Sequence, residues 1–187
     1  MTISALSMSS RIMMPAIFCS ANDDASTVTH SKGADNGDDD GEYWTVTTGN
    51  GTKYVFDLNK LDGAGTDDRT ESVRTVPVFG DDDTEPGYDA GTSFSGRDLK
   101  QAWRWNLDYV EDTHGNAMSY WYTAEHNSYD KLGDDTTGTD YVRGGYLKEI
   151  RYGQRAGALF SGSPPVPTRW SSTTPSAAWP PEPAATP

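Results

Sequence analysis

Residues 102–123, AWRWNLDYVEDTHGNAMSYWYT, decide the fold class of this chain. From position 102 to position 110, apolar and polar side chains alternate one by one, which is the period of a half-buried β-strand. A turn at 111–116, rich in Asp, Gly and Asn, leads into a return strand at 117–123. The alternation predicts one apolar face made of Trp103, Trp105, Leu107 and Tyr109, with Arg104, Asn106 and Asp108 on the other face.

The return strand carries aromatic side chains on both of its faces. Met118, Tyr120 and Tyr122 share one face, while Trp121 lies on the opposite one. Both faces of this strand are therefore expected to contact other parts of the chain.

Another hairpin precedes this one. Residues 43–48 and 52–58 are rich in strand formers, and the Gly-Asn-Gly sequence between them is a hairpin signal. The alternation places Trp44 and Val46 on one face of the first strand, and Tyr54, Phe56 and Leu58 on one face of the second.

Two further strands complete the predicted fold. One spans 73–79, where Pro77 indicates an edge position, and the other spans 146–152. No window favours a helix over a strand. The predicted fold class is mainly β, an antiparallel meander of hairpins.

Composition limits the class of protein. The 187 residues include 15 Lys and Arg against 28 Asp and Glu, a net charge of −13, which argues against a nucleic-acid or anionic-membrane surface. No stretch approaches the roughly 20 apolar residues of a membrane helix. The single cysteine, Cys19, excludes an internal disulfide framework and a multi-cysteine metal site. Hydrophobic residues are only 34%, but aromatic residues, at 11%, supply large core area.

The sequence divides into three segments. Residues 1–32 predict a poorly structured start, in which the apolar stretch 12–19 is interrupted by Pro15 and is only a weak match to an export signal. Residues 33–160 hold the predicted strands. Residues 161–187 hold most of the 11 prolines without periodicity, so this tail is predicted to be disordered.

The hairpins share a plan of turn glycine, alternating strand and aromatic residues near the strand end. Asp112-x-x-Gly-Asn followed by Tyr120-x-Tyr, and then Gly145-x-Leu-x-x-Ile-x-Tyr, resembles the repeat of the bacterial RHS, or YD-repeat, proteins. The blocks GEYWTVTTGNGTKYVFDLNKL, TVPVFGDD, AWRWNLDYVEDTHGNAMSYWY and GGYLKEIRYGQRAGALF look, in this order, like the region that leads into those repeats.

What the resemblance implies is architectural. Members of that family wind β-hairpins into a hollow shell around a C-terminal toxin or other cargo, and they are secreted or displayed at the cell surface. Their autoproteolytic and toxin segments have no counterpart here, so no catalytic residue is carried over. The chain would then be a fragment of an RHS-type shell, with the remaining repeats or the cargo as its partners.

Asn36, Asp38, Asp40 and Gly41 resemble the first half of a calcium loop, which takes oxygen ligands at alternating positions. Thr47 stands where such a loop has its bidentate Glu. A solvated acidic turn is the preferred interpretation, and calcium binding stays open. The run of aspartates at Asp81, Asp82 and Asp83 is interpreted in the same way.

The histidines suit no catalytic arrangement. His114 lies two residues after Asp112, where it suits a turn better than a triad. No Gly-x-Ser-x-Gly motif supplies a nucleophile, His30 and His126 have no supporting context, and Gly63–Gly65 is misplaced for a phosphate loop. We therefore predict no catalytic, cofactor-binding or metal-binding residue, and a protein that is not an enzyme.

The aromatic strands allow two interpretations. Packed against a neighbouring hairpin, they form a core. Exposed, they form a platform that stacks on sugars. The core is favoured because large exposed apolar patches are uncommon, and the residues concerned are Trp103, Trp105, Tyr120 and Tyr122.

Three functional hypotheses follow. The leading one is a non-enzymatic shell fragment, marginally stable and self-associating because its strand edges lack neighbours. The alternative is a carbohydrate-binding β module with a cell-surface glycan as its partner. A degenerate hydrolase, which needs a pocket containing His114 and a nucleophile, is the third.

Overall fold

The computed structural model describes residues 2–4, 17–19, 25–85, 87–130, 138–161 and 168–172. This part of the chain contains strands, all paired antiparallel, two short 3-10 helices and no α-helix, which confirms the mainly-β prediction. No helix in these ranges is long and apolar enough to cross a membrane. The elements are β1 (Thr2–Ser4), β2 (Ile17–Cys19), β3 (Thr27–Ser31), β4 (Tyr43–Thr47), β5 (Lys53–Phe56), β6 (Val73–Phe79), η1 (Tyr88–Ala90), η2 (Phe94–Gly96), β7 (Asp98–Glu111), β8 (Asn116–Tyr129), β9 (Thr139–Arg155) and β10 (Thr168–Ser171).

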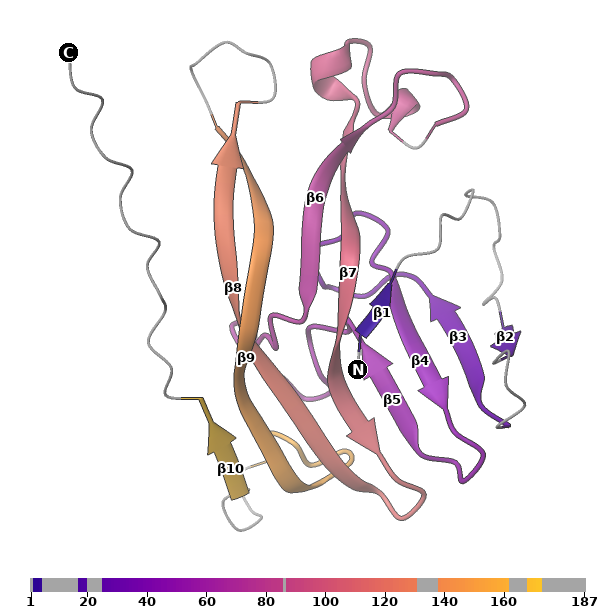
Figure 1. The fold of residues 1–187 in the computed structure, drawn as a ribbon, viewed down its shortest axis with the longest axis vertical. Coiled ribbons are helices and arrows are strands. Elements are labelled where there is room, and N and C mark those ends of the chain that lie inside the picture. The colour runs from indigo at the N-terminus through magenta and orange to yellow at the C-terminus, as the bar shows by residue number, and fades with distance from the viewer. Residues whose placement is uncertain are drawn as a thin grey trace, which may run out of the picture.

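The strands form a broad sheet from which two prongs rise (Figure 1). The order across the sheet is β10-β9-β8-β7-β5-β4-β3-β2. β7 is central because it changes partners along its length. Its C-terminal part pairs with β5 and β8, and its N-terminal part pairs with β6. The β6–β7 pair forms one prong and the far half of the β8–β9 pair forms the other (Figure 1).

Both predicted hairpins are present. β4 and β5 pair with Trp44 opposite Phe56 and Val46 opposite Tyr54, so these four side chains share one face. The second strand is shorter than predicted, because β5 ends at Phe56 and Asp57 has a φ of 62°, so the predicted place of Leu58 on that strand is wrong. The hairpin of β7 and β8 has the predicted turn, but β7, β8 and β9 are longer than the expected strands. β6 has the predicted bounds and pairs only with β7 in the described residues, in agreement with an edge position for Pro77.

The strict alternation predicted for β7 is wrong at two places, because β7 has two bulges. Opposite β5, Tyr54 pairs with Val110 and Phe56 with Leu107, which leaves Asp108 as an extra residue. Val110 rather than Tyr109 therefore continues the core face.

The other bulge lies opposite β6. Arg74 pairs with Arg104 and Thr75 with Ala102, which leaves Trp103 unpaired between them. Trp103 is consequently 41% exposed, whereas Trp105 is 6% exposed.

Both faces of β8 contact other parts of the chain, as predicted. Trp121 is buried between the Phe160 ring, whose centroid is 6.2 Å away, and the Arg151 guanidinium, 3.9 Å from its centroid. Tyr120 packs against the core on the other face, and the hydroxyl of Tyr122 donates to the Leu107 carbonyl at 2.7 Å.

The hydrophobic core lies on one face of the sheet and runs across the strands in register. Phe56 is fully buried at its centre, and Trp44 meets Trp105 edge to face at 6.1 Å. Directly paired residues project on the same face, so each row is a continuous apolar strip. The rows are Val28–Val46–Tyr54–Val110–Met118, Trp44–Phe56–Leu107 and Tyr120–Ile150–Trp170.

Two sequence predictions about the chain ends are wrong where the structure describes those ends. β3, within the predicted poorly structured start, pairs with β4, and β10, within the predicted disordered tail, pairs with β9. Backbone hydrogen bonds to a neighbouring strand order these segments, and composition does not report such bonds. The rest of 1–24 and 162–187, apart from the two short N-terminal strands and residues 168–172, lies outside the described residues.

The two prongs meet closely at Gly145 of β9. A Cβ atom built on Gly145 would lie 2.3 Å from Nη2 of Arg74 and 2.5 Å from the carbonyl oxygen of Thr123. We expect Gly145→Ala to displace the Arg74 guanidinium of β6 and the Thr123 carbonyl of β8, and to lower the free energy of unfolding by about 1–3 kcal/mol, as overpacking does. Urea unfolding followed by tryptophan fluorescence measures this loss.

Gly144→Ala is the matched control. A Cβ atom on Gly144 would meet only the flexible end of Glu125, at 3.3 Å, so we expect little change. Equal unfolding midpoints for the two variants would show that the close approach at Gly145 does not hold the prongs together.

Candidate functional site

Residues 57–72 connect β5 to β6, and we call this segment the 57–72 loop. Beneath it lies a cluster of buried polar side chains, the most unusual group in the described residues. Asp108, the bulge residue of β7, has no exposed surface. Its Oδ2 accepts hydrogen bonds from the Asn59 backbone at 2.7 Å, the Ser72 hydroxyl at 3.1 Å and the Thr70 hydroxyl at 3.3 Å. Its Oδ1 has no hydrogen-bond partner.

Asp57 is the second buried acid of the cluster, and its side chain also has no exposed surface. Its backbone N–H donates to the Asn106 carbonyl at 3.1 Å, and its Oδ1 accepts from the Asn106 N–H at 3.0 Å. Asp57 thus continues the pairing of β5 with β7 by using a side-chain oxygen. Its Oδ2 is buried without a partner, like Oδ1 of Asp108.

Arg74 of β6 brings a positive charge to the cluster. Its side chain is 2% exposed, and its guanidinium donates to the carbonyls of Glu71 at 2.6 Å and Val73 at 2.9 Å. The guanidinium carbon lies 5.7 Å from the ring centroid of Tyr122 on β8. Arg74 therefore connects β6 with the second prong as well as with the 57–72 loop.

The loop backbone is strained around these acids. Asp57, Asn59 and Glu71 have φ angles of 62°, 59° and 54°, a region that residues other than glycine seldom adopt. Two hydrogen bonds hold the strained residues: the Glu71 N–H donates to Oδ1 of Asn59, and the Thr70 N–H donates to the Asn59 carbonyl, both at 2.9 Å. Such strain persists only where surrounding contacts over-determine it.

Burial shifts the proton affinity of both acids in the same direction. It raises the pKa of Asp108 to about 7, against the opposing effect of the bonds from Asn59, Ser72 and Thr70. Burial also raises the pKa of Asp57 well above its ordinary value, and the charge of Asp108 adds to this shift while that of Arg74 opposes it. The cluster can hold a proton near neutral pH, but with both acids fully buried no substrate can contact them.

Sequence reasoning did not identify this cluster. The alternation places Asp108 on the polar face of its strand, and Asp57 falls within the predicted strand 52–58. An Asp within a predicted strand is the one local signal, and 28 acidic residues in the chain make that signal common here.

The calcium-like loop has a structural use. Oδ1 of Asp38 accepts the backbone N–H groups of Asp40 and Glu42, and its Oδ2 accepts that of Ala102 on β7 at 2.6 Å. Asn36 donates to the carbonyls of Glu42 and Asp57, and Oδ2 of Asp40 pairs with Lys32. These oxygens already accept hydrogen bonds, so the segment is a structural turn. The prediction of a solvated turn is wrong for Asn36 and Asp38, which are buried.

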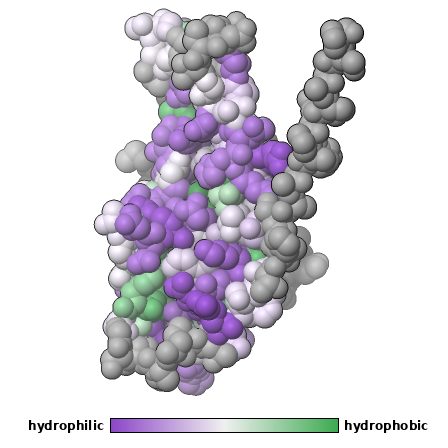
Figure 2. Space-filling model, turned by 90° about the vertical axis from the view of Figure 1, so that its left-hand side faces the viewer, coloured by the Kyte–Doolittle hydropathy of each residue, from purple (hydrophilic) through white to green (hydrophobic). Residues whose placement is uncertain are grey.

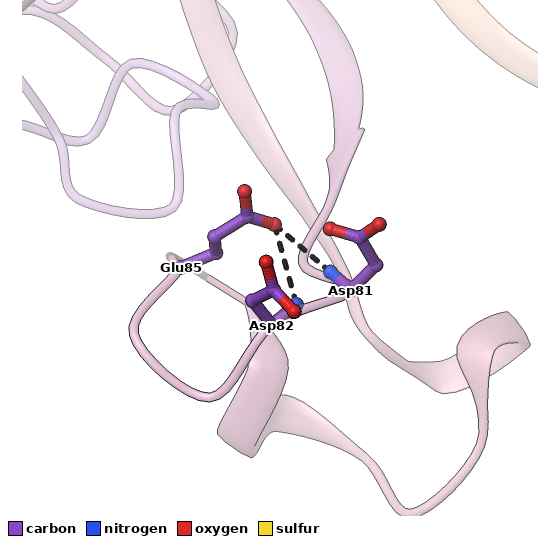
Figure 3. A group of neighbouring side chains, drawn as sticks. All are labelled: Asp81, Asp82 and Glu85. Atoms are coloured by element: carbon purple, nitrogen blue, oxygen red, sulfur yellow. Dashed lines mark hydrogen bonds between the residues drawn. The ribbon is translucent and has the colours of Figure 1, made fainter.

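The aspartate run after β6 contributes to an exposed acidic group, Asp81, Asp82 and Glu85 (Figure 3). Oε2 of Glu85 accepts the backbone N–H of Asp81 at 2.9 Å and that of Asp82 at 3.5 Å, which lowers the pKa of Glu85. The bond and charge of Glu85 raise the pKa of Asp81. Glu85 thus closes a surface turn, and this explains why the three acidic side chains lie together.

His114 lies in the turn between β7 and β8, as predicted. Its backbone N–H donates to Oδ1 of Asp112 at 2.8 Å, and its carbonyl accepts from Arg155 at 2.8 Å. The other histidines lie elsewhere: His30 stacks on Trp44 with ring centroids 4.4 Å apart, and His126 is exposed on β8.

The four candidate platform aromatics do not form one flat exposed surface. Trp105 is in the core, and Tyr120 and Tyr122 are half-buried. Trp103 is exposed, but its indole N–H donates to the Val142 carbonyl of β9 at 3.2 Å. The core interpretation therefore holds for Trp105, whereas Trp103 lies outside the core.

Comparisons with known proteins find little. No protein-family profile matches the sequence, and no curated protein matches it. Among solved structures, the crystal structure of TcdB2-TccC3 is similar with a TM-score of 0.37 and 14% sequence identity, over 76% of this chain and 6% of that chain. This is a distant likeness that shows neither family nor function, so the RHS resemblance stays a prediction.

Removing the buried guanidinium tests the cohesion of the cluster. Arg74→Met leaves two buried carbonyls without their donor and takes the cation away from Asp57, so we expect a loss of about 1–3 kcal/mol in the free energy of unfolding. Chemical denaturation measures it.

Arg104→Met is the control, because Arg104 lies directly opposite Arg74 in the strand pair but is exposed. A variant of Arg74 as stable as this control would show that the guanidinium is not part of the supporting network.

Proposed function

We propose that this chain is a structural segment, without catalytic activity of its own, of a larger RHS-type β-shell. The observation that carries the proposal is the apolar face, two of whose rows end in exposed residues, Met118 and Trp170, on the β8–β10 side of the sheet. Val46 and Val110, in the middle, are 9% and 6% exposed, whereas Trp170, at the β10 end, is 49% exposed. An apolar face that opens at one end suits a neighbouring hairpin that continues it.

The open end is a small patch on β8, β9 and β10. Trp170 is opposite Ile150 in the β9–β10 pair, and Tyr152 is two residues from Ile150, so both lie on the core face. Met118 ends the adjacent row on β8. Tyr152 and Met118 are 40% and 36% exposed, although much of the side next to β8 and β9 is hydrophilic (Figure 2).

Partners and location follow from the same proposal. Further β-hairpins of the shell would cover the open end, with the cargo of that shell as a second partner. Secretion or display at the cell surface belongs to the proposal because the resembled proteins are exported. The acids, 28 against 15 basic residues, keep an exposed β segment soluble between its contacts.

A carbohydrate-binding module is the second candidate. The exposed indole of Trp103 favours it, since a sugar face can stack on such a ring. Against it, Trp105 is buried, so Trp103 lacks the companion that a flat platform on this strand requires.

The patch is tested by self-association. We expect the wild-type chain to sediment as increasingly large species as its concentration rises, because uncovered apolar faces and strand edges associate. Tyr152→Lys combined with Trp170→Lys is expected to return it to the monomer. Analytical ultracentrifugation of the full chain gives the answer.

Val78→Lys serves as the control, since Val78 is 38% exposed on β6, away from the patch. A monomer at all concentrations, or equal dissociation by the control, would argue against the patch as a docking face. Hydrolase turnover by the purified wild type, or glycan binding lost in a folded Trp103→Ala variant, would replace the structural proposal.

A further inference from the structure

The buried acids present an electrostatic problem, because two negative charges lie close together away from solvent. Asp57 and Asp108 are both fully buried, and each has one oxygen without a partner. An ionised carboxylate in such surroundings is unfavourable unless a cation pairs with it. Arg74 is buried beside the cluster and can balance one negative charge, but it cannot balance two.

The same acids hold the 57–72 loop on β7. Asp108 accepts from Asn59, Thr70 and Ser72 of that loop, and Asp57 pairs with Asn106 of the strand. The backbone strain of the loop opposes its docking, so the loop is released more readily once both buried acids are charged and their burial becomes unfavourable.

We propose that Asp57 and Asp108 form a proton-controlled latch: with a proton on the pair, the 57–72 loop stays docked on β7, and with both carboxyls ionised it detaches. The latch is separate from the proposed shell role, because it concerns contacts within this chain. Either proposal can fail without the other.

Other charged and titratable groups face the cluster. Asp38, from the 33–41 turn, adds negative charge next to Asp57 and so favours the proton. Burial raises the pKa of Tyr122 of β8 and the charge of Asp108 adds to the shift, so this tyrosine stays neutral over the relevant range. Arg104 and Glu71 act on Arg74 in opposite directions. Arg74 is therefore the main balancing charge.

The sign of the pH effect follows from the raised proton affinity. Below the ordinary pKa of 3.8, Asp108 is protonated in the folded and the unfolded chain, so its stabilising effect is complete. Between pH 3.8 and about 7, only the folded chain keeps the proton, so stability falls as pH rises and levels off above about 7. For each proton that only the folded chain holds, the folding equilibrium constant falls by up to about tenfold for every unit of pH rise within this window.

Hydrogen-exchange mass spectrometry on the full chain, from pH 5.5 to 8.5 and corrected for intrinsic exchange rates, tests the latch. Amides of the 57–72 loop are expected to lose protection as pH rises towards and through neutrality, by up to about tenfold per pH unit. Amides of the β4–β5 hairpin are expected to lose less. Protection of the loop that does not change with pH would overturn the proposal.

Asp108→Asn mimics the protonated acid and retains an oxygen that accepts from Asn59, Thr70 and Ser72. It should keep the loop protected at pH 8.5. Asp67→Asn is the control, since Asp67 is exposed in the same loop and should leave the pH dependence intact.

A second test uses the wild-type chain, so it does not require a variant to fold. Carbon NMR of the chain with isotope-labelled aspartate follows the titration of each aspartate carboxyl. The latch requires at least one aspartate carboxyl that titrates well above 3.8, with assignment from Asp57→Asn or Asp108→Asn, whichever folds. Titration of every aspartate near 3.8 would overturn the proposal.

Discussion

β7 changes its partner strands near residues 106–108, and the rest of the fold follows from that change. On one side of this point the strand belongs to the broad sheet with β5 and β8, and on the other side it belongs to the prong with β6. Backbone groups at such a change lose their regular strand partners and must find others. Asp57, Asn106 and the 57–72 loop supply them, with side-chain oxygens in place of a strand.

This substitution explains why polar groups lie beneath a β-sheet whose other face is apolar. The aromatic rows provide the hydrophobic stabilisation, since they run in register from β3 to β8 with Phe56 fully buried. The polar cluster holds the 57–72 loop to β7 at the point where the two prongs separate. Buried carboxylates make this arrangement sensitive to protonation, whereas an apolar junction would not be.

The functional proposals draw on opposite faces of one sheet. The core face opens towards Trp170 and suits a neighbouring hairpin, which agrees with a segment of a larger β assembly. The other face carries the latch.

The sequence by itself determined the hairpins, because the alternation of residues 43–58 and 102–123 and the Gly-containing turns are local signals. It also determined that Trp44 and Val46 share a face of one strand and that Tyr54 and Phe56 share a face of the next. Only the tertiary structure decided the bulges at Trp103 and Asp108, the ordering of β3 and β10, and the meeting of Asp57, Arg74 and Asp108. These depend on which strands become neighbours, and a bulge reverses every side chain beyond it, so no local pattern contains them.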